Sequence, residues 1–353
     1  MKRIICLLIV VIVISYSCFA QTNSLQAKVD ERVELVSVFC HLIGFNAENN
    51  LNACSTYSAA VDEYFAPYLR DIYIIANPDS KPIPRSSMNY QAIVSASLAL
   101  KIENEEVKYD SVNTDYITML EINYQKEGLD KILVMLSKFY KLTSFNKFYN
   151  SQRNIYEKAE NLYNKDVIAE YKPGIYEDLF AINHKEIKIY LSMLSGSLAY
   201  PVPQAQSLIL GVVGCPDEIK GGYFINKTPI NNLVSCVTDI FVYNELSNIE
   251  PMVKIYTESY YKSAVVMFDR SGYSIDEIFL NQYSKLCQVY YTSKDINSQA
   301  AFQKLVKYKS EGFIWINELW DSFDQLIQER TSFPYFKDMV TVLVDKYKQL
   351  PAY

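Results

Sequence analysis

The stretch from Ser207 to Glu245 constrains the fold more than any other part of the chain, because strand, turn and helix signals follow one another there. Residues 207–214 read SLILGVVG, a short run rich in β-branched side chains that glycine closes. Residues 221–225 read GGYFI and follow a turn with Pro216 and Asp217. We expect the two runs to pair as antiparallel strands.

A helix is expected to begin directly after these strands. Thr228 suits the N-cap, and Pro229 suits the first helical position, where its missing N–H is not needed. Apolar residues then recur every three or four positions and define one face: Ile230, Leu233, Val234, Val237, Ile240 and Phe241. A polar stripe runs beside that face and is the candidate site: Ser235, Cys236, Asp239 and Tyr243.

This helix resembles one found in an uncharacterised family of secreted bacterial proteins, known only as a domain of unknown function. Members of that family carry a zincin-like HExxH motif at this point, where two His bind Zn²⁺ and the Glu is general base. Here residues 235–239 read Ser-Cys-Val-Thr-Asp, so Ser235, Cys236 and Asp239 replace all three. The resemblance therefore implies a degenerate motif with no catalytic residues, no metal and no cofactor.

The resemblance covers most of the chain, as short sequence matches that occur in the same order. It includes residues 32–35 (RVEL), residues 311–314 (EGFI) and residues 330–336 before a last helix. In the family a downstream helix offers a Glu suited to be the third metal ligand, and Gln282 aligns with it. Tyr243 and Glu245, near the end of the motif helix, are implied to border the same cleft.

The first residues have the pattern of a signal peptide. Lys2 and Arg3 precede an apolar run from Ile4 to Ile14, and Ala20 suits cleavage before Gln21. A lipoprotein signal ending at Cys18 is the alternative, although Ser15 and Tyr16 fit a lipobox poorly. We expect a secreted or periplasmic protein, with no membrane span after cleavage.

Charge excludes one class of partner. The whole chain has 34 basic and 40 acidic residues, and removing Lys2 and Arg3 leaves 32 against 40, a net charge of −8. No basic cluster of the kind that contacts a phosphate backbone is present. Nucleic acid is therefore not expected as a partner.

Cysteine and histidine give little support to other chemistry. Five cysteines follow the signal segment: Cys40, Cys54, Cys215, Cys236 and Cys287. A bridge between Cys40 and Cys54 is one alternative, and buried free thiols are the favoured one. His41 and His184 lie on different expected elements, so a zinc site of Cys236, Asp239 and His184 has no support from spacing.

The expected architecture is α+β: mostly helical, with a small, largely antiparallel sheet at residues 187–225 packed on the zincin-like helix. Residues 21–172 form a helical N-terminal region, and residues 173–353 form the zincin-like region with C-terminal helices. Residues 196–206, with Pro201 and Pro203, are expected to be a loop, and 101–110 a polar exposed stretch. The 30 Tyr and 17 Phe are expected mainly in helix seams.

Three functions follow from this sequence. The preferred one is a non-catalytic homologue that binds a peptide, a glycan or an envelope protein in the cleft where the family would hold metal. The first alternative is a hydrolase that uses Asp239, Glu245 or Cys236 in the same cleft. The second alternative is an envelope assembly subunit whose aromatic surface is its interface.

Overall fold

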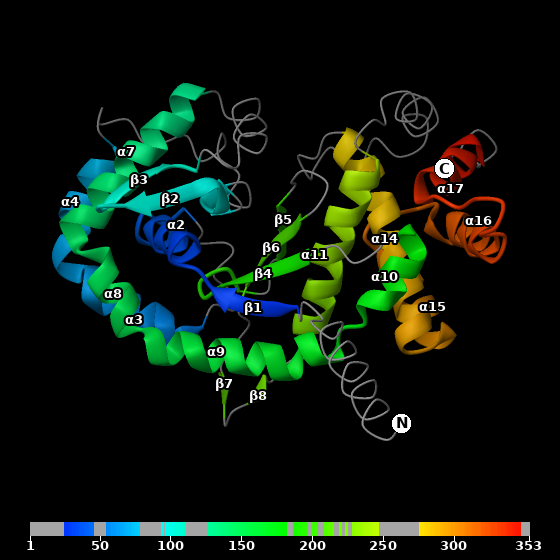
Figure 1. Cartoon of the computed structure of the whole chain (residues 1–353), viewed down its shortest axis with the longest axis horizontal. Coiled ribbons are helices and arrows are strands. Elements are labelled where there is room, and N and C mark those ends of the chain that lie inside the picture. Colours follow the sequence, from blue (N-terminus) through cyan, green and yellow to red (C-terminus); the bar gives the residue numbers. More distant parts are fainter. Residues whose placement is uncertain are drawn as a thin grey trace, which may run out of the picture.

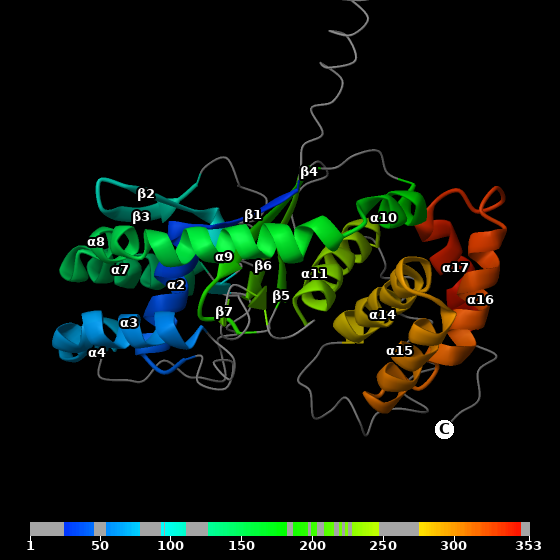
Figure 2. The same cartoon turned by 90° about the horizontal axis from the view of Figure 1, so that it is seen from below.

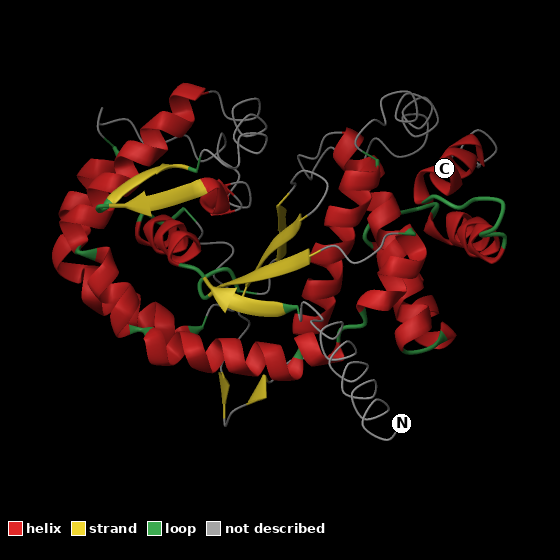
Figure 3. Cartoon of the chain, viewed as in Figure 1, coloured by secondary structure: helices red, strands yellow, loops and turns green. Residues whose placement is uncertain are grey.

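The computed structural model describes residues 25–45, 54–77, 93–94, 96–110, 126–181, 186–196, 199–202, 208–214, 219–220, 223–224, 228–246 and 275–346. Helices surround a small central sheet (Figure 3), so the chain is α+β and mostly helical, as the sequence predicts. No helix within these ranges is both long enough and apolar enough to cross a bilayer.

The central sheet is mixed rather than largely antiparallel. It has the order β1-β4-β6-β5, formed by Gln26–Val29, Glu186–Ser192, Leu208–Gly214 and Ala199–Val202. Both the β1–β4 and the β4–β6 pairs are parallel, with Gln26 opposite Lys188 and Glu186 opposite Leu208. Only β5 runs antiparallel, to β6. The prediction of a largely antiparallel sheet that starts near residue 187 is therefore wrong.

The expected pairing around residues 207–225 is also wrong. β8 (Tyr223–Phe224) pairs with β7 (Ile219–Lys220) in a separate two-stranded ladder. The antiparallel neighbour of β6 is β5, which lies within the segment expected to be a loop. Because β5 is an edge strand, it needs hydrogen bonds on one side only, and such a strand accepts a proline such as Pro201.

The other edge strand, β1, is covered by α9 (Arg153–Asp166), which Figure 2 shows crossing in front of the sheet. The Asn164 side chain accepts from the Ala27 N–H at 2.8 Å and donates to the Ala27 carbonyl at 3.0 Å. Glu160 accepts from the Val29 N–H at 2.7 Å. Two side chains one helical turn apart thus satisfy the free edge that another strand would otherwise pair with.

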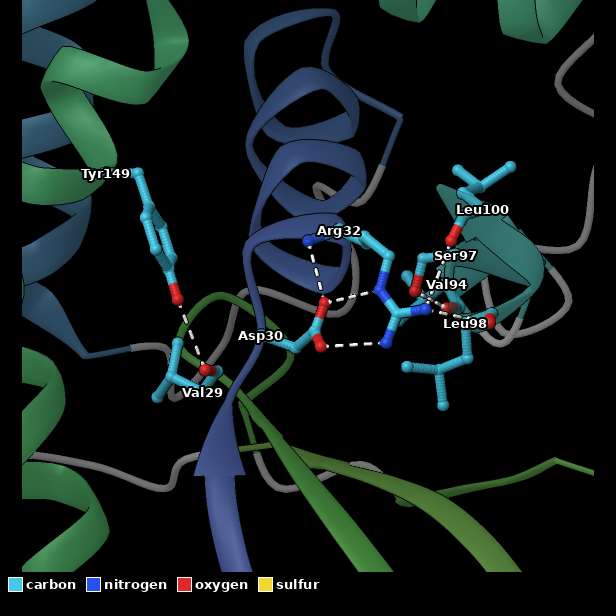
Figure 4. Close-up of polar contacts among 8 residues, drawn as sticks. All are labelled: Val29, Asp30, Arg32, Val94, Ser97, Leu98, Leu100 and Tyr149. Atoms are coloured by element: carbon cyan, nitrogen blue, oxygen red, sulfur yellow. Dashed lines mark hydrogen bonds and ion pairs between the residues drawn. The ribbon is translucent and has the colours of Figure 1, made fainter. Parts of the chain in front are cut away.

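The first long helix, α2 (Glu31–Leu42), begins at a charged cap (Figure 4). Asp30 accepts a hydrogen bond from the Arg32 N–H at 2.9 Å, and the Arg32 guanidinium grips the same carboxylate with two contacts of 2.8 Å. The remaining guanidinium nitrogen donates to the carbonyls of Leu98 and Leu100, at 3.2 and 3.1 Å. One arginine therefore joins the helix start to the segment that enters β2.

Residues 100–109 form a hairpin that the sequence analysis missed. β2 (Leu100–Glu103) pairs with β3 (Glu106–Tyr109) in antiparallel fashion. The turn residues Asn104 and Glu105 have φ of 51° and 62°, the left-handed pair that a two-residue hairpin turn uses. The charged composition concealed this turn, because no glycine marks it.

The described helices form an N-terminal group and a later group. The N-terminal ones are α2, α3 (Ser55–Phe65), α4 (Leu69–Ala76), α7 (Lys126–Thr143), α8 (Phe145–Ser151) and α9, with short 3₁₀ turns at Ala66–Tyr68, Ser97–Ala99 and Ile168–Glu170. The later ones are α10 (Pro173–Phe180), α11 (Thr228–Glu245), α14 (Ile275–Asp295), α15 (Ser298–Ser310), α16 (Ile316–Gln328) and α17 (Phe336–Lys346). In Figure 1 α2 to α8 lie to the left of the central sheet, α9 runs below it, and the later helices lie to the right.

Aromatic side chains form the core of the N-terminal group. Phe65 is fully buried, and its ring lies 5.4 Å from that of Phe139 and 4.9 Å from that of Phe148, measured between centroids. Tyr57 and Tyr156 are buried beside them, and their hydroxyls form a hydrogen bond of 2.9 Å. The expectation that most aromatics serve as core is confirmed for this region.

A buried carboxyl group connects this core to the sheet. Glu34 of α2 has no exposed surface and accepts a hydrogen bond from the Met193 N–H, directly after β4, at 2.9 Å. Burial raises the pKa of Glu34 to about 7, although hydrogen bonds from Tyr57 and Met193 oppose the rise. The folded chain therefore holds a proton here that an ordinary glutamate releases near pH 4.5.

We predict that Glu34 makes stability fall as pH rises. Because its folded pKa is the higher one, its contribution is complete below about pH 4.5 and is lost between pH 4.5 and 7. That loss is on the order of 3 kcal/mol. Urea unfolding should show that Glu34→Gln flattens this slope and is more stable than wild type at pH 8. The control Glu63→Gln, at an exposed position on α3, should keep the wild-type dependence of stability on pH. If Glu34→Gln kept it too, the raised pKa of Glu34 would be refuted.

Candidate functional site

Helix α11 carries the candidate site and lies between the sheet and α14 (Figure 1). One side of it contacts β5 and β6, and another side contacts α14. It begins at Thr228 and ends at Glu245, as the capping residues predict. The side chains of residues 235–239 are therefore divided between two different neighbours.

Cys236 points to the sheet. Its side chain is fully buried, and a Cβ placed on Gly211 of β6 would lie 2.5 Å from its Sγ. Gly211 thus provides the space that the thiol occupies. Ser235 and Asp239, four residues apart and on one face of the helix, contact α14 instead. The structure therefore separates Cys236 from the other two motif positions.

Ser235 and Asp239 belong to a hydrogen-bonded cluster that we call the polar seam, formed with Ser284, Gln288 and Tyr308. The Ser284 hydroxyl donates to Asp239 Oδ1. The Gln288 amide donates to Ser284 Oγ at 3.0 Å and to Ser235 Oγ at 3.1 Å. The Tyr308 hydroxyl of α15 donates to Gln288 Oε1 at 2.6 Å. One glutamine thus connects α11, α14 and α15.

The electrostatics of the seam centre on Asp239. Burial raises the pKa of Asp239, while the positive charge of Lys285 and the hydrogen bond from Ser284 oppose that rise. The Lys285 ammonium lies 5.0 Å from the centroid of the Tyr308 ring, so its charge is held beside the seam. These interactions position the carboxyl group between protein groups that already bind it.

The thiols of the described residues are unsuited to nucleophilic catalysis. Cys40, Cys54, Cys236 and Cys287 are buried and free, and burial raises the pKa of each. A nucleophilic cysteine needs a lowered pKa instead, so that its thiol is ionised to the thiolate at neutral pH. The alternative of a Cys40–Cys54 bridge is therefore wrong, and Cys215 lies outside the described residues.

Other predicted site residues do not join the seam. Gln282 lies on α14 two positions before Ser284, which places it about 200° away around the helix. Its amide nitrogen is buried, without a hydrogen-bond partner in the described part of the chain. Tyr243 is 40% exposed and, like Glu245, lies in the last turns of α11.

Metal chemistry has no ligand set among the residues that the structure describes. Nowhere in these ranges do three side chains of His, Cys, Asp or Glu come together in a way that could hold an ion. His41 Nε2 lies 2.9 Å from Asp62 Oδ1, on α2 and α3. His184 falls outside the described residues.

Sequence reasoning identified Ser235 and Asp239 but missed the residues that bind them. A signal was nevertheless present, because Ser284, Gln288 and Thr292 recur every four residues along an amphipathic helix. The same spacing relates Ser235 to Asp239 on α11. Matching polar stripes on two amphipathic helices predict that they pack on each other through hydrogen bonds.

No family model matches this chain, and neither the curated proteins nor the solved structures contain a significant match. The likeness to zincin-like proteins therefore depends on the residues quoted above.

We predict unequal effects for two buried glutamines of α14. Gln288→Met should lower the free energy of unfolding by about 2–4 kcal/mol, because it leaves the Ser235 and Tyr308 hydroxyls without their partner. Gln282→Met is the matched control and should change it by less than about 1 kcal/mol, because it removes a buried amide nitrogen that has no hydrogen-bond partner among the described residues. Urea unfolding at pH 7 measures both, and equal losses would contradict the seam.

Proposed function

We propose that this chain is an exported, non-catalytic binding protein in which a zincin-like helix has become a structural element. The observation that carries this proposal is the polar seam, in which Asp239 and Ser235 form hydrogen bonds with Ser284 and Gln288 of α14, and Gln288 in turn binds Tyr308 of α15. The signal pattern at residues 1–20 and the degenerate motif support the same proposal.

The hydrolase alternative has less support from the geometry. A general base must reach a substrate proton, whereas the Asp239 carboxyl accepts from Ser284 within the packed helices. A cysteine nucleophile would need an accessible thiolate, whereas the Cys236 thiol is buried against β6. Both groups act as parts of the fold.

Binding is supported by apolar side chains that point to solvent. On α4, Leu69 and Tyr73 are 46% and 66% exposed and one helical turn apart. On α15, Phe302 and Val306 are 61% and 52% exposed with the same spacing. Exposed aromatic and aliphatic pairs of this kind suit a peptide, a glycan or an envelope protein, including a subunit of an assembly.

Metal content and peptidase activity of the purified protein, expressed without residues 1–20, test this proposal. After dialysis against zinc and removal of free ion, we expect far less than one zinc per chain. We also expect no cleavage of a casein substrate, because the described residues contain no ligand set for zinc, and without a bound ion a zincin-like site has no activated water.

The same preparation provides the control. A chelator should leave the melting temperature unchanged, since only a bound ion links stability to metal. One zinc per chain, together with peptidase activity that the chelator abolishes, would refute the non-catalytic role.

A further inference from the structure

The polar seam continues for one more turn and ends at Lys304. Its ammonium donates to Thr292 Oγ1 at 3.0 Å and to Asn231 Oδ1 at 3.4 Å. Thr292 follows Gln288 by four residues, and Asn231 precedes Ser235 by four, so both belong to the same helix faces. Lys304 therefore lies where α11, α14 and α15 meet.

Both acceptors of Lys304 are neutral, and its cationic neighbours repel it. The positive charges of Lys285 and Lys307 act against the Lys304 ammonium, and Asp295 is the acid whose charge favours it. Asp295, however, is already bound to Lys172 at 2.6 Å. Lys304 thus lacks an acidic partner of its own among the described residues.

The other lysines around this junction each have an acid beside them. Lys307 lies 3.6 Å from Glu311, and the charge of Lys285 acts on Asp239. Among the described residues that these interactions join, four lysines (Lys172, Lys285, Lys304 and Lys307) face three acids (Asp239, Asp295 and Glu311), so one positive charge is in excess. This local excess contrasts with the net charge of −6 of the whole chain.

Keeping a partly buried ammonium without a counterion is unfavourable. Burial lowers the pKa of Lys304 to about 8, with further lowering by Lys285 and Lys307. The group nevertheless retains some solvent access, and an ammonium offers three N–H donors, of which two are used here. An anion placed at the third donor would remove the imbalance.

We propose that the junction at Lys304 is an oxyanion-binding site that takes a carboxylate or a phosphate group. Lys304 supplies the central charge and donor, and Lys285 and Lys307 raise the local positive potential. The site goes beyond the binding role proposed above, because it names a ligand chemistry and lies away from the exposed apolar pairs. It also stands whether or not the chain has catalytic activity.

NMR of the mature chain labelled with ¹³C at lysine Cε tests this site. Inorganic phosphate and acetate are titrated separately against a sodium chloride background that keeps ionic strength constant. We expect a saturable shift of the Lys304 signal, and a pKa that rises by about one unit when the anion is bound. Response to phosphate alone, to acetate alone or to both defines the oxyanion, and each response supports the site.

Two matched variants on α15 distinguish specific anion binding at Lys304 from nonspecific screening of lysine charges by salt. In the wild-type chain we expect the signals of the neighbouring Lys285 and Lys307 to shift with the same saturation as that of Lys304. Lys304→Met should abolish this response, whereas Lys309→Met, at an exposed position of the same helix, should retain it. Circular dichroism verifies that both variants are folded. No saturable shift with either anion, or an unchanged response in folded Lys304→Met, would overturn the proposal.

Discussion

The need of buried polar groups for hydrogen-bond partners determines how the C-terminal half of this chain packs. Gln288 is 3% exposed and binds hydroxyl groups of α11, α14 and α15, so these three helices meet around one amide. An unsatisfied group there costs about 1–3 kcal/mol, which favours this arrangement over other apolar packings of the same helices. The apolar faces of α11, α14 and α15 drive these helices to pack, while the polar seam determines how they are aligned along one another.

The same requirement ties the first strand to the rest of the sheet. β1 is only four residues long and lies at an edge, where its outer N–H groups need acceptors. Asn164 and Glu160 supply them from a helix more than 130 positions later. The N-terminal helices and the later strands therefore form one structure around the sheet, with Arg32 and Glu34 joining α2 to the hairpin and to β4.

Local signals in the sequence were sufficient for the start of α11 but not for the sheet. Thr228 and Pro229 correctly located the start of α11, because capping chemistry acts within one turn. β1 and β5 were missed because a strand of four residues is too short to show a clear alternation of apolar and polar side chains. In β5, Pro201 also argued against a strand, since proline is tolerated only in an edge strand and the sequence does not show which strands lie at an edge. The candidate residues Ser235 and Asp239 were found, but their partners Ser284 and Gln288 lie on α14, more than 40 positions later, and a polar stripe on one helix does not say which other helix packs against it.

The central claim is that Asp239 holds helices together rather than performing chemistry. A double-mutant cycle with Asp239→Ala and Ser284→Ala tests it most directly, by urea unfolding at pH 7. If the two groups act on each other as the structure shows, the cycle should give a coupling energy of about 1–3 kcal/mol. Losses that add to within about 0.5 kcal/mol would show independent groups and would contradict the account.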